Sequence, residues 1–177
     1  MSENKNVYKF KITLFGAPSV GKTSLILRYV KDSFSEDLKK TIGTSFLIKE
    51  IELNEALLKL LIWDIGGQSQ FSSLRQVYFK GSQAAIGVYD ITSPESLLRI
   101  PGWISSIKKT VGDIPMVLVG NKIDLEENRR VPREDALDLA QRLNCKHYES
   151  SALSGENVED LFREIAELTY ANSQDEE

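Results

Sequence analysis

The sequence predicts a three-layer α/β fold whose six-stranded sheet is mostly parallel, with one antiparallel edge strand. The first observation is that short apolar runs alternate with longer amphipathic stretches along the chain. The second is that several of these runs are continuously apolar, as in strands that helices cover on both faces. An early pair of runs instead alternates apolar and polar residues, which indicates a half-exposed hairpin.

The predicted elements follow one another in a regular order. The expected strands are residues 8–15, 46–53, 57–63, 84–89, 116–119 and 146–149. The expected helices are residues 23–31, 94–111, 132–143 and 158–170. Asn54 and Glu55 form the expected turn of the hairpin. The length of 177 residues suits one domain. We expect residues 1–7 to be a flexible N-terminus, 8–171 the folded domain and 172–177 a flexible acidic C-terminus.

Composition and charge exclude several classes of function. The net charge of −4 argues against a general surface for nucleic acid or anionic membranes. No segment approaches the roughly 20 apolar residues that span a bilayer. With one cysteine, Cys145, no intramolecular disulfide is possible, which fits a reducing compartment. We expect Cys145 to be a packed apolar side chain rather than a reactive thiol, and the protein to be a cytoplasmic monomer.

The two ends of the sequence show no signal for a lipid anchor. The start, MSENKNVYKF, is polar, and Ser2 stands where N-myristoylation needs glycine. The end, TYANSQDEE, is acidic and has no cysteine for prenylation. We therefore expect no lipid anchor within the given residues, and membrane association stays open.

The first predicted strand runs into GAPSVGKTS, which has the pattern G-x-x-x-x-G-K-[ST] between a strand and a helix. Its glycines let backbone N–H groups turn inward as an anion nest, and the helix N-terminus adds positive dipole. Lys22 is placed to reach β- and γ-phosphates, and the Thr23 hydroxyl to bind Mg²⁺. The loop therefore predicts a nucleotide phosphate site.

Pro18 has no N–H and cannot donate to phosphate, so we expect it to shape the space beside the γ-phosphate. The expected phosphate-binding residues are Gly16, Ser19, Val20, Gly21, Lys22, Thr23 and Ser24.

Two later loops predict the choice of base: NKIDL follows the fifth strand and SAL follows the last. The carboxylate of Asp124 is suited to accept hydrogen bonds from N1–H and the exocyclic amine of guanine, a donor pair that adenine lacks. Asn121 is expected to bridge the base and the phosphate loop, Lys122 to lay its stem along the base, and the Ala152 N–H to bond the guanine carbonyl. The residues expected around the base are Asn121, Lys122, Asp124, Leu125, Ser151, Ala152 and Leu153.

With these motifs in place, the sequence resembles a small GTPase of the Ras superfamily, and most closely the Rab branch. The resemblance covers residues 8–170 and rests on GAPSVGKTSL, TIGTSFLIKEIEL, IWDIGGQ, VYDITSPESL, GNKIDL and SSAL. It implies the P-loop NTPase fold of a G domain and a molecular switch that hydrolyses GTP to GDP and phosphate with Mg²⁺. It also implies membrane-traffic or signalling roles, slow intrinsic turnover, and a GTPase-activating protein, an exchange factor and effectors that bind the switch loops.

The resemblance also assigns roles in two switch loops. The first switch follows the first helix and carries Thr41, and the second switch begins at Asp64. Thr41 would bind Mg²⁺ when the γ-phosphate is present, and Asp64 would hold Mg²⁺ through a water. The Gly67 N–H would bond the γ-phosphate, and Gln68 would orient the attacking water. Phe34 would pack on the guanine; the alternative is that it anchors its loop in the core. The implied catalytic residues are Gln68, Lys22 and Thr41, and the implied metal ligands are Thr23, Thr41 and Asp64.

Some positions depart from the family pattern. Ile65 and Gly66 replace the usual Thr-Ala, so that D-x-G-G-Q resembles the Arf branch, and Gly66 is expected to loosen the second switch. Leu153 replaces a lysine at the base. Arg75 in the second switch is expected to be a solvated charge on a helix rather than an arginine finger. Because of Pro18 and this pair, a nucleotide-bound interaction module with negligible hydrolysis stays open; a phosphoryl transferase would need a lid domain for which the chain has no room.

Three aromatic residues, Phe46, Trp63 and Tyr78, match the positions at which Rab proteins meet effectors. The alternative is ordinary core packing. Phe46 and Trp63 lie on the two strands of the predicted hairpin, so we expect them to form a cross-strand pair. The resemblance favours an effector patch.

Overall fold

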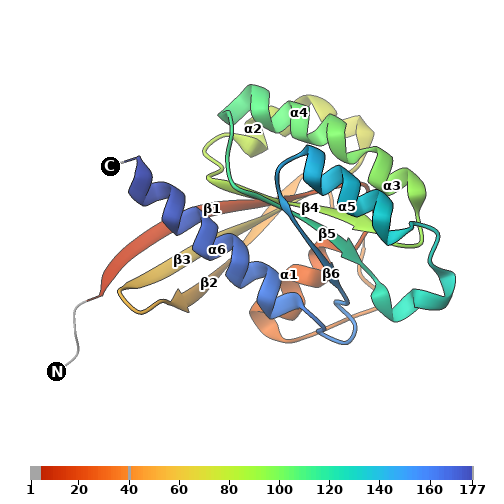
Figure 1. Ribbon diagram of the computed structural model, residues 1–177, viewed down its shortest axis with the longest axis horizontal. Coiled ribbons are helices and arrows are strands. Elements are labelled where there is room, and N and C mark those ends of the chain that lie inside the picture. Colours follow the sequence, from red (N-terminus) through yellow and green to blue (C-terminus); the bar gives the residue numbers. More distant parts are fainter. Residues whose placement is uncertain (1–4, 40, 177) are drawn as a thin grey trace.

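The computed structural model describes residues 5–39 and 41–176, and strands and helices alternate along it (Figure 1). The strands are β1 (Asn6–Phe15), β2 (Thr44–Glu52), β3 (Ala56–Ile65), β4 (Ala84–Asp90), β5 (Met116–Asn121) and β6 (Lys146–Ser150). The α-helices are α1 (Lys22–Lys31), α2 (Arg75–Phe79), α3 (Pro94–Leu98), α4 (Ile100–Val111), α5 (Arg133–Arg142) and α6 (Val158–Asp175). Two 3₁₀ segments are η1 (Ser69–Leu74) and η2 (Ile123–Asn128).

The six strands form one sheet in the order β2-β3-β1-β4-β5-β6. β2 runs antiparallel to β3 at one edge, and all the other neighbouring pairs are parallel. The predicted fold class is therefore confirmed. Because parallel strands end at the same edge of a sheet, the loops after β1, β3, β5 and β6 meet there, and that edge is where ligands bind in open α/β sheets.

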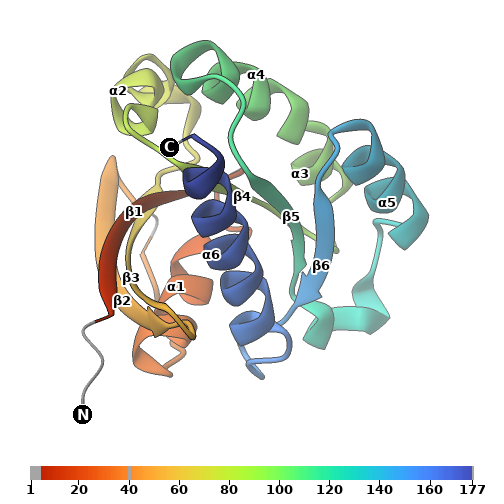
Figure 2. The same ribbon diagram turned by 60° about the vertical axis from the view of Figure 1, so that its left-hand side comes forward.

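Helices cover both faces of the sheet and make three layers (Figures 1 and 2). α1 and α6 pack on one face, where the rings of Tyr29 and Phe162 stack with centroids 4.1 Å apart. α2, α4 and α5 pack on the other face, around Phe79 and Trp103. Every residue of β4 is buried between the two layers, which explains its continuous apolar run.

Some boundaries differ from the prediction. The stretch expected to be one helix over residues 94–111 is broken after Leu98, and Pro101 explains the break because it has no N–H to donate one turn back. Residues 172–175, expected to be flexible, continue α6, and β1 begins at Asn6. Residues 1–4 and 177 of the expected flexible ends lie outside the described residues.

The short segments η1, α2 and η2 were not predicted. Each has six residues or fewer, too short for a helical hydrophobic pattern to emerge. Among the described helices, none combines the length and the apolar character needed to cross a membrane.

Candidate functional site

A cavity of about 510 Å³ opens where the loops after β1, β3, β5 and β6 meet. Its volume is that of a small-molecule site. The predicted residues that line it are Ser19, Gly21, Lys22, Thr23, Ser24, Phe34, Thr41, Gly67, Gln68, Asn121, Lys122, Asp124, Leu125, Ala152 and Leu153. The other predicted ligand-binding or metal residues, Gly16, Val20, Asp64 and Ser151, are buried.

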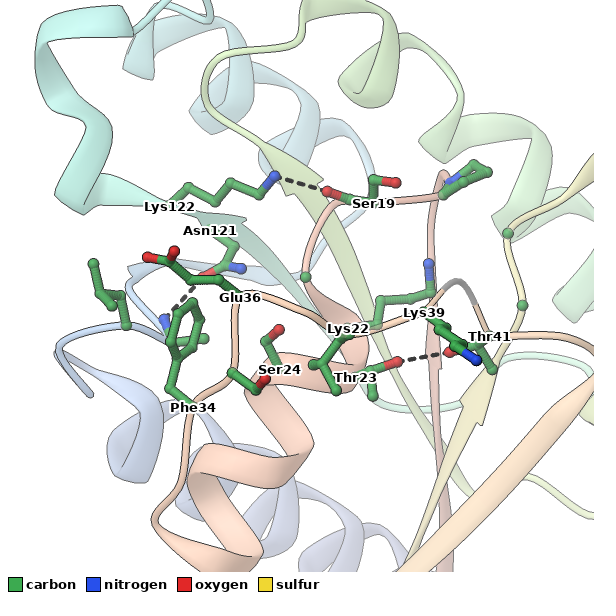
Figure 3. A pocket seen from close by; sticks show the side chains of 18 of the residues that line it. Ser19, Lys22, Thr23, Ser24, Phe34, Glu36, Lys39, Thr41, Asn121 and Lys122 are labelled. Atoms are coloured by element: carbon green, nitrogen blue, oxygen red, sulfur yellow. Dashed lines mark hydrogen bonds between the residues drawn. The ribbon is translucent and has the colours of Figure 1, made fainter.

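Lys22 lies at one end of this cavity, at the first position of α1 (Figure 3). It is 6% exposed, and its Nζ donates to the carbonyls of Gly16 and Ala17 at 2.9 and 2.8 Å. Burial lowers the pKa of Lys22 to about 8, although the Asp64 carboxylate opposes this shift. An anionic ligand beside Nζ would therefore stabilise the charged form of this buried amine.

Three oxygen-bearing side chains converge next to Lys22. The hydroxyl oxygens of Thr23 and Thr41 are 2.7 Å apart, a hydrogen bond drawn as a dashed line in Figure 3. The Thr41 hydroxyl donates to Asp64 Oδ2 at 3.2 Å. Thr23 also donates to Asp64 Oδ2. The second carboxylate oxygen, Oδ1, is buried and has no hydrogen-bond partner among the described residues. This set of hard oxygens with one unsatisfied carboxylate atom suits a divalent cation such as Mg²⁺.

Asn121 and Lys122 lie at the other end of the cavity (Figure 3). The buried Asn121 amide donates to the Val20 carbonyl at 3.0 Å, so it ties the end of β5 to the phosphate loop. Lys122 Nζ donates to the Ser19 carbonyl at 2.7 Å and pairs with Asp90 at 2.9 Å. Of the two contacts predicted for Asn121, the structure contains the one to the phosphate loop. The contact to a base stays a prediction.

The Asp124 carboxylate accepts a hydrogen bond from the Ser151 hydroxyl at 2.7 Å, which orients it from the loop after β6. The Ala152 N–H, expected to face a guanine carbonyl, donates to Asn121 Oδ1 at 3.3 Å. Phe34 both lines the cavity and packs against the core, so its two alternative roles are compatible. The exposed Leu153 lines the cavity, and its carbonyl accepts from Arg28 at 2.8 Å.

The sequence model of the Ras family matches residues 11–171 of this chain. Ras-related protein Rab-21 of Canis lupus familiaris is 37% identical over 171 residues, which are 96% of this chain and 77% of that protein. The chain belongs to the Ras family of small GTPases. Ras-related protein RABC2b of Arabidopsis thaliana is 45% identical over 160 residues, 89% of this chain and 78% of the relative. Ras-related protein RabJ of Dictyostelium discoideum is 42% identical over 167 residues, 94% and 65% of the two chains. The chain is thus a Rab-like small GTPase of this family.

Arg75 of this Rab-like GTPase is not the solvated charge that the sequence predicted. Its guanidinium lies 3.5 Å from the centroid of the Trp103 ring, and its Nε is buried without a hydrogen-bond partner among the described residues. Burial lowers the pKa of Arg75, and Arg99 adds to this shift. The prediction was wrong because α2 packs against α4, which turns the first residue of α2 toward Trp103. Arg75 does not line the cavity.

The aromatic residues of the hairpin form the expected cross-strand pair. Phe46 and Trp63 face each other in the β2–β3 register, and their rings stack with centroids 4.8 Å apart. Phe46 is 48% exposed, so it is not a core residue. Trp63 and Tyr78 are half-buried, and Lys11 Nζ lies 4.3 Å from the Trp63 ring. A surface of this kind, with exposed aromatic area on a rigid sheet, is suited to partner binding.

Several cavity residues of this GTPase were missed by the sequence analysis. They lie mostly in the loop after α1: Ser35, Glu36, Leu38 and Lys39, together with Gly66 in the second switch. The spacing between α1 and Thr41 was a usable signal, because a loop that carries Thr41 to the cation position must pass over the phosphate loop.

Proposed function

We propose that this Rab-like GTPase is a two-state switch that binds GTP, hydrolyses it to GDP and phosphate, and acts in membrane traffic or signalling. The observation that carries the proposal is the convergence of Lys22, Thr23, Thr41 and Asp64 at one end of a cavity whose other end presents Asp124. The first end is suited to phosphates and the second to guanine, so the proposed ligand is a guanine nucleotide.

In this proposal the guanine lies between Phe34 and the stem of Lys122, with Asp124 accepting from its N1–H and amine. Leu125, Ala152 and Leu153 complete the base end. The phosphates lie on the loop from Gly16 to Ser24, where backbone N–H groups and the dipole of α1 favour anions. The buried Lys22 amine supplies the charge that reaches the β- and γ-phosphates.

Mg²⁺ is the proposed cofactor, held by the hydroxyls of Thr23 and Thr41 and, through water, by Asp64. The unsatisfied Asp64 Oδ1 supports this assignment. When bound, Mg²⁺ would neutralise charge on the β- and γ-phosphate oxygens. Among the described residues no group of three or more His, Cys, Asp or Glu side chains is arranged to hold a metal ion.

Hydrolysis is proposed to depend on Gln68, which lines the cavity and would orient the attacking water, while the Gly67 N–H bonds the γ-phosphate. No arginine of the described chain lines the cavity, and Arg75 is held on Trp103. Slow turnover, raised when a GTPase-activating protein supplies the missing charge, follows from this arrangement.

Loss of the γ-phosphate removes the ligand contacts of Thr41 and Gly67, so both switch loops change together. Effectors would recognise the closed loops beside Phe46, Trp63 and Tyr78, and an exchange factor would act on the same loops. We place the protein in the cytoplasm as a monomer with a domain over residues 8–171, and leave its membrane association open. We further propose that the second switch, with its motif D-x-G-G-Q, resembles that of the Arf branch.

An alternative is a nucleotide-bound interaction module with negligible hydrolysis. The observation that favours it is Pro18, which lines the same cavity as Gly66, Gly67 and Gln68. A Cβ built on Gly67 would lie 2.5 Å from Pro18 N, so the proline ring stands beside the segment that must orient the water.

Single-turnover hydrolysis of loaded GTP, followed as phosphate release, separates the two functions. The wild-type rate should exceed that of Gln68→Leu by about tenfold or more, because the variant loses the water-orienting amide. Equal rates over hours would leave the binding module as the function. The nucleotide released by heating the purified protein should be GDP or GTP, and finding ADP would overturn the assignment of Asp124.

A further inference from the structure

Arg28, a residue of α1, holds the loop after β6 from outside the cavity. Its Nε donates to the Ala152 carbonyl and its Nη2 to the Leu153 carbonyl, both at 2.8 Å. The side chain is 19% exposed, and Arg28 does not line the cavity. One guanidinium therefore ties the helix that follows the phosphate loop to a loop that begins more than a hundred residues later in the chain.

The loop that Arg28 holds is part of the base end of the cavity. Ala152 and Leu153 both line the cavity. The Ala152 N–H is the group expected to face a guanine carbonyl, and its direction depends on how the neighbouring peptide planes are turned. Because the two peptide groups that follow this N–H give their carbonyl oxygens to one rigid guanidinium, Arg28 restrains both planes.

The same loop also orients the carboxylate expected to read the base. Ser151, its first residue, donates from its hydroxyl to Asp124 at 2.7 Å. The Ser151 carbonyl accepts from the Gly155 N–H at 2.7 Å, which closes the turn. Gly155 lies next to Arg28, since a Cβ built on it would be 3.6 Å from Arg28 Cδ. Arg28 thus supports a turn whose first residue positions Asp124.

The third contact of Arg28 is of a different kind. Its Nη1 pairs with Asp32 at 3.0 Å, one helical turn later. The Asp32 side chain is 91% exposed, so water screens this pair and its contribution is small. The bonds from the guanidinium to the two loop carbonyls are charge-assisted and mostly shielded from water, which makes them the stronger contacts.

We propose that Arg28 is a positioning residue for the base: it holds the Ala152 and Leu153 carbonyls so that the Ala152 N–H and Asp124 stay in place around guanine. Without this side chain the loop moves away from the base, and the nucleotide leaves faster whether or not it carries a γ-phosphate. For the identity of the ligand this inference rests on the proposed function.

The main test measures the release of fluorescent GDP and of a fluorescent non-hydrolysable GTP analogue. Arg28→Ala should release both ligands about tenfold faster or more, which corresponds to about 1.4 kcal/mol. The two factors should agree within about twofold, because both ligands carry the same base. No acceleration, or acceleration of the triphosphate alone, would overturn the inference.

Asp32→Asn is the matched control, because it removes the surface ion pair and leaves the two carbonyl contacts of Arg28. Asparagine also tolerates the left-handed backbone of this position, where φ is 48°. Both release rates should stay within about twofold of wild type. Release as fast as from Arg28→Ala would show that the ion pair, and not the hold on the loop, matters.

A modified base separates positioning from general stability. In 6-thio-GDP a sulfur, a weak acceptor, replaces the carbonyl oxygen that the Ala152 N–H would bond. The preference of wild type for GDP over 6-thio-GDP should fall by about threefold or more in Arg28→Ala. Arg28→Lys keeps a cation that can donate to a carbonyl, so it should restore part of this preference. An unchanged preference in Arg28→Ala would contradict a positioning role.

Hydrogen exchange of the purified protein, without added nucleotide, gives a readout that does not depend on guanine. The amides of residues 152–155 should exchange faster in Arg28→Ala than in wild type or Asp32→Asn. Unchanged exchange in this segment would reject the hold on the loop. If exchange rises while the protein binds no guanine nucleotide, the hold on the loop stands and the proposed function fails.

Discussion

The two ends of the cavity are built differently. At the base end each polar group of Asn121 has a protein partner: its amide nitrogen bonds Val20, and its oxygen accepts from Ser150 and from the Ala152 N–H. At the switch end the side chains of Thr23, Thr41 and Asp64 bond one another, and one Asp64 oxygen has no partner in the described chain.

Under the proposed function, one end would select the ligand and the other would respond to it. The base end is held by side chains at the ends of β5 and β6, so recognition there is pre-organised and costs little ordering on binding. The switch end is held by close backbone contacts of two loops at Gly66 and Gly67, which a γ-phosphate and a cation would reinforce or release. Three changes probe the base end, the second switch and the sheet, in order of decreasing effect.

The largest effect is expected for Asp124→Asn at the base end. The amide would present a donor where guanine also donates, so affinity for guanine nucleotides should fall by about a hundredfold or more. Xanthine nucleotides, which have a carbonyl in place of the amine, should gain affinity. Competition binding with GDP and XDP measures both, and retention of full guanine affinity would refute the role of this carboxylate.

A smaller effect is expected for Arg75→Ala, which removes the cation stacked on Trp103 and so weakens the contact of α2 with α4. The loss should be about 0.5–2 kcal/mol in the free energy of unfolding, and exchange of the amides of α2 should rise while that of β6 stays constant. The matched control is Arg99→Ala, whose partner is the exposed Glu95 on the same turn, and it should cost less. Equal effects in thermal unfolding would show that the stack contributes nothing specific.

The smallest effect concerns the pH dependence of stability in the sheet. Tyr89 and His147 share a hydrogen bond of 2.7 Å on β4 and β6, and burial lowers the pKa of His147 from 6.5, with Glu149 opposing and Arg133 and Arg129 adding to the shift. The unfolded chain therefore binds the extra proton first. Stability contributed at higher pH is lost as pH falls below about 6.5 toward the lower folded pKa.

Urea unfolding at pH 7.5 and 5.5 checks this sign. Wild type should lose more stability across this interval than His147→Gln, which does not titrate there. Equal losses would show that His147 has the same pKa in the folded and unfolded chains.

The sequence predicted the fold well because each strand is a distinct apolar run between turn residues. The buried β4 and the alternating hairpin of β2 and β3 show the two patterns most clearly. The break before α4 was missed because the amphipathic pattern continues across Pro101, whose missing N–H decides the local structure. The continuation of α6 to Asp175 was missed because polar residues alone do not end a helix.

The candidate site was predicted where a loop motif fixes its own geometry, as at Lys22 and Asp124. It was not predicted where the geometry depends on tertiary packing. Two examples are the contact of Arg75 with the Trp103 ring and the hydrogen bond from the Ala152 N–H to Asn121. Each joins segments that are far apart in the sequence, so no local residue spacing predicts it. The close approach of Thr41 to Gly66 is of the same kind.

The two tryptophans of the chain each lie beside a cation next to the second switch. Trp63 directly precedes Asp64 and lies under Lys11, whose Nζ also donates to the carbonyls of Tyr78 and Lys80 at the end of α2. Trp103 lies under Arg75 at the start of α2. Any displacement of α2 therefore changes the charge beside an indole ring. We expect the intrinsic fluorescence of the unlabelled protein to change its wavelength or intensity whenever the second switch rearranges.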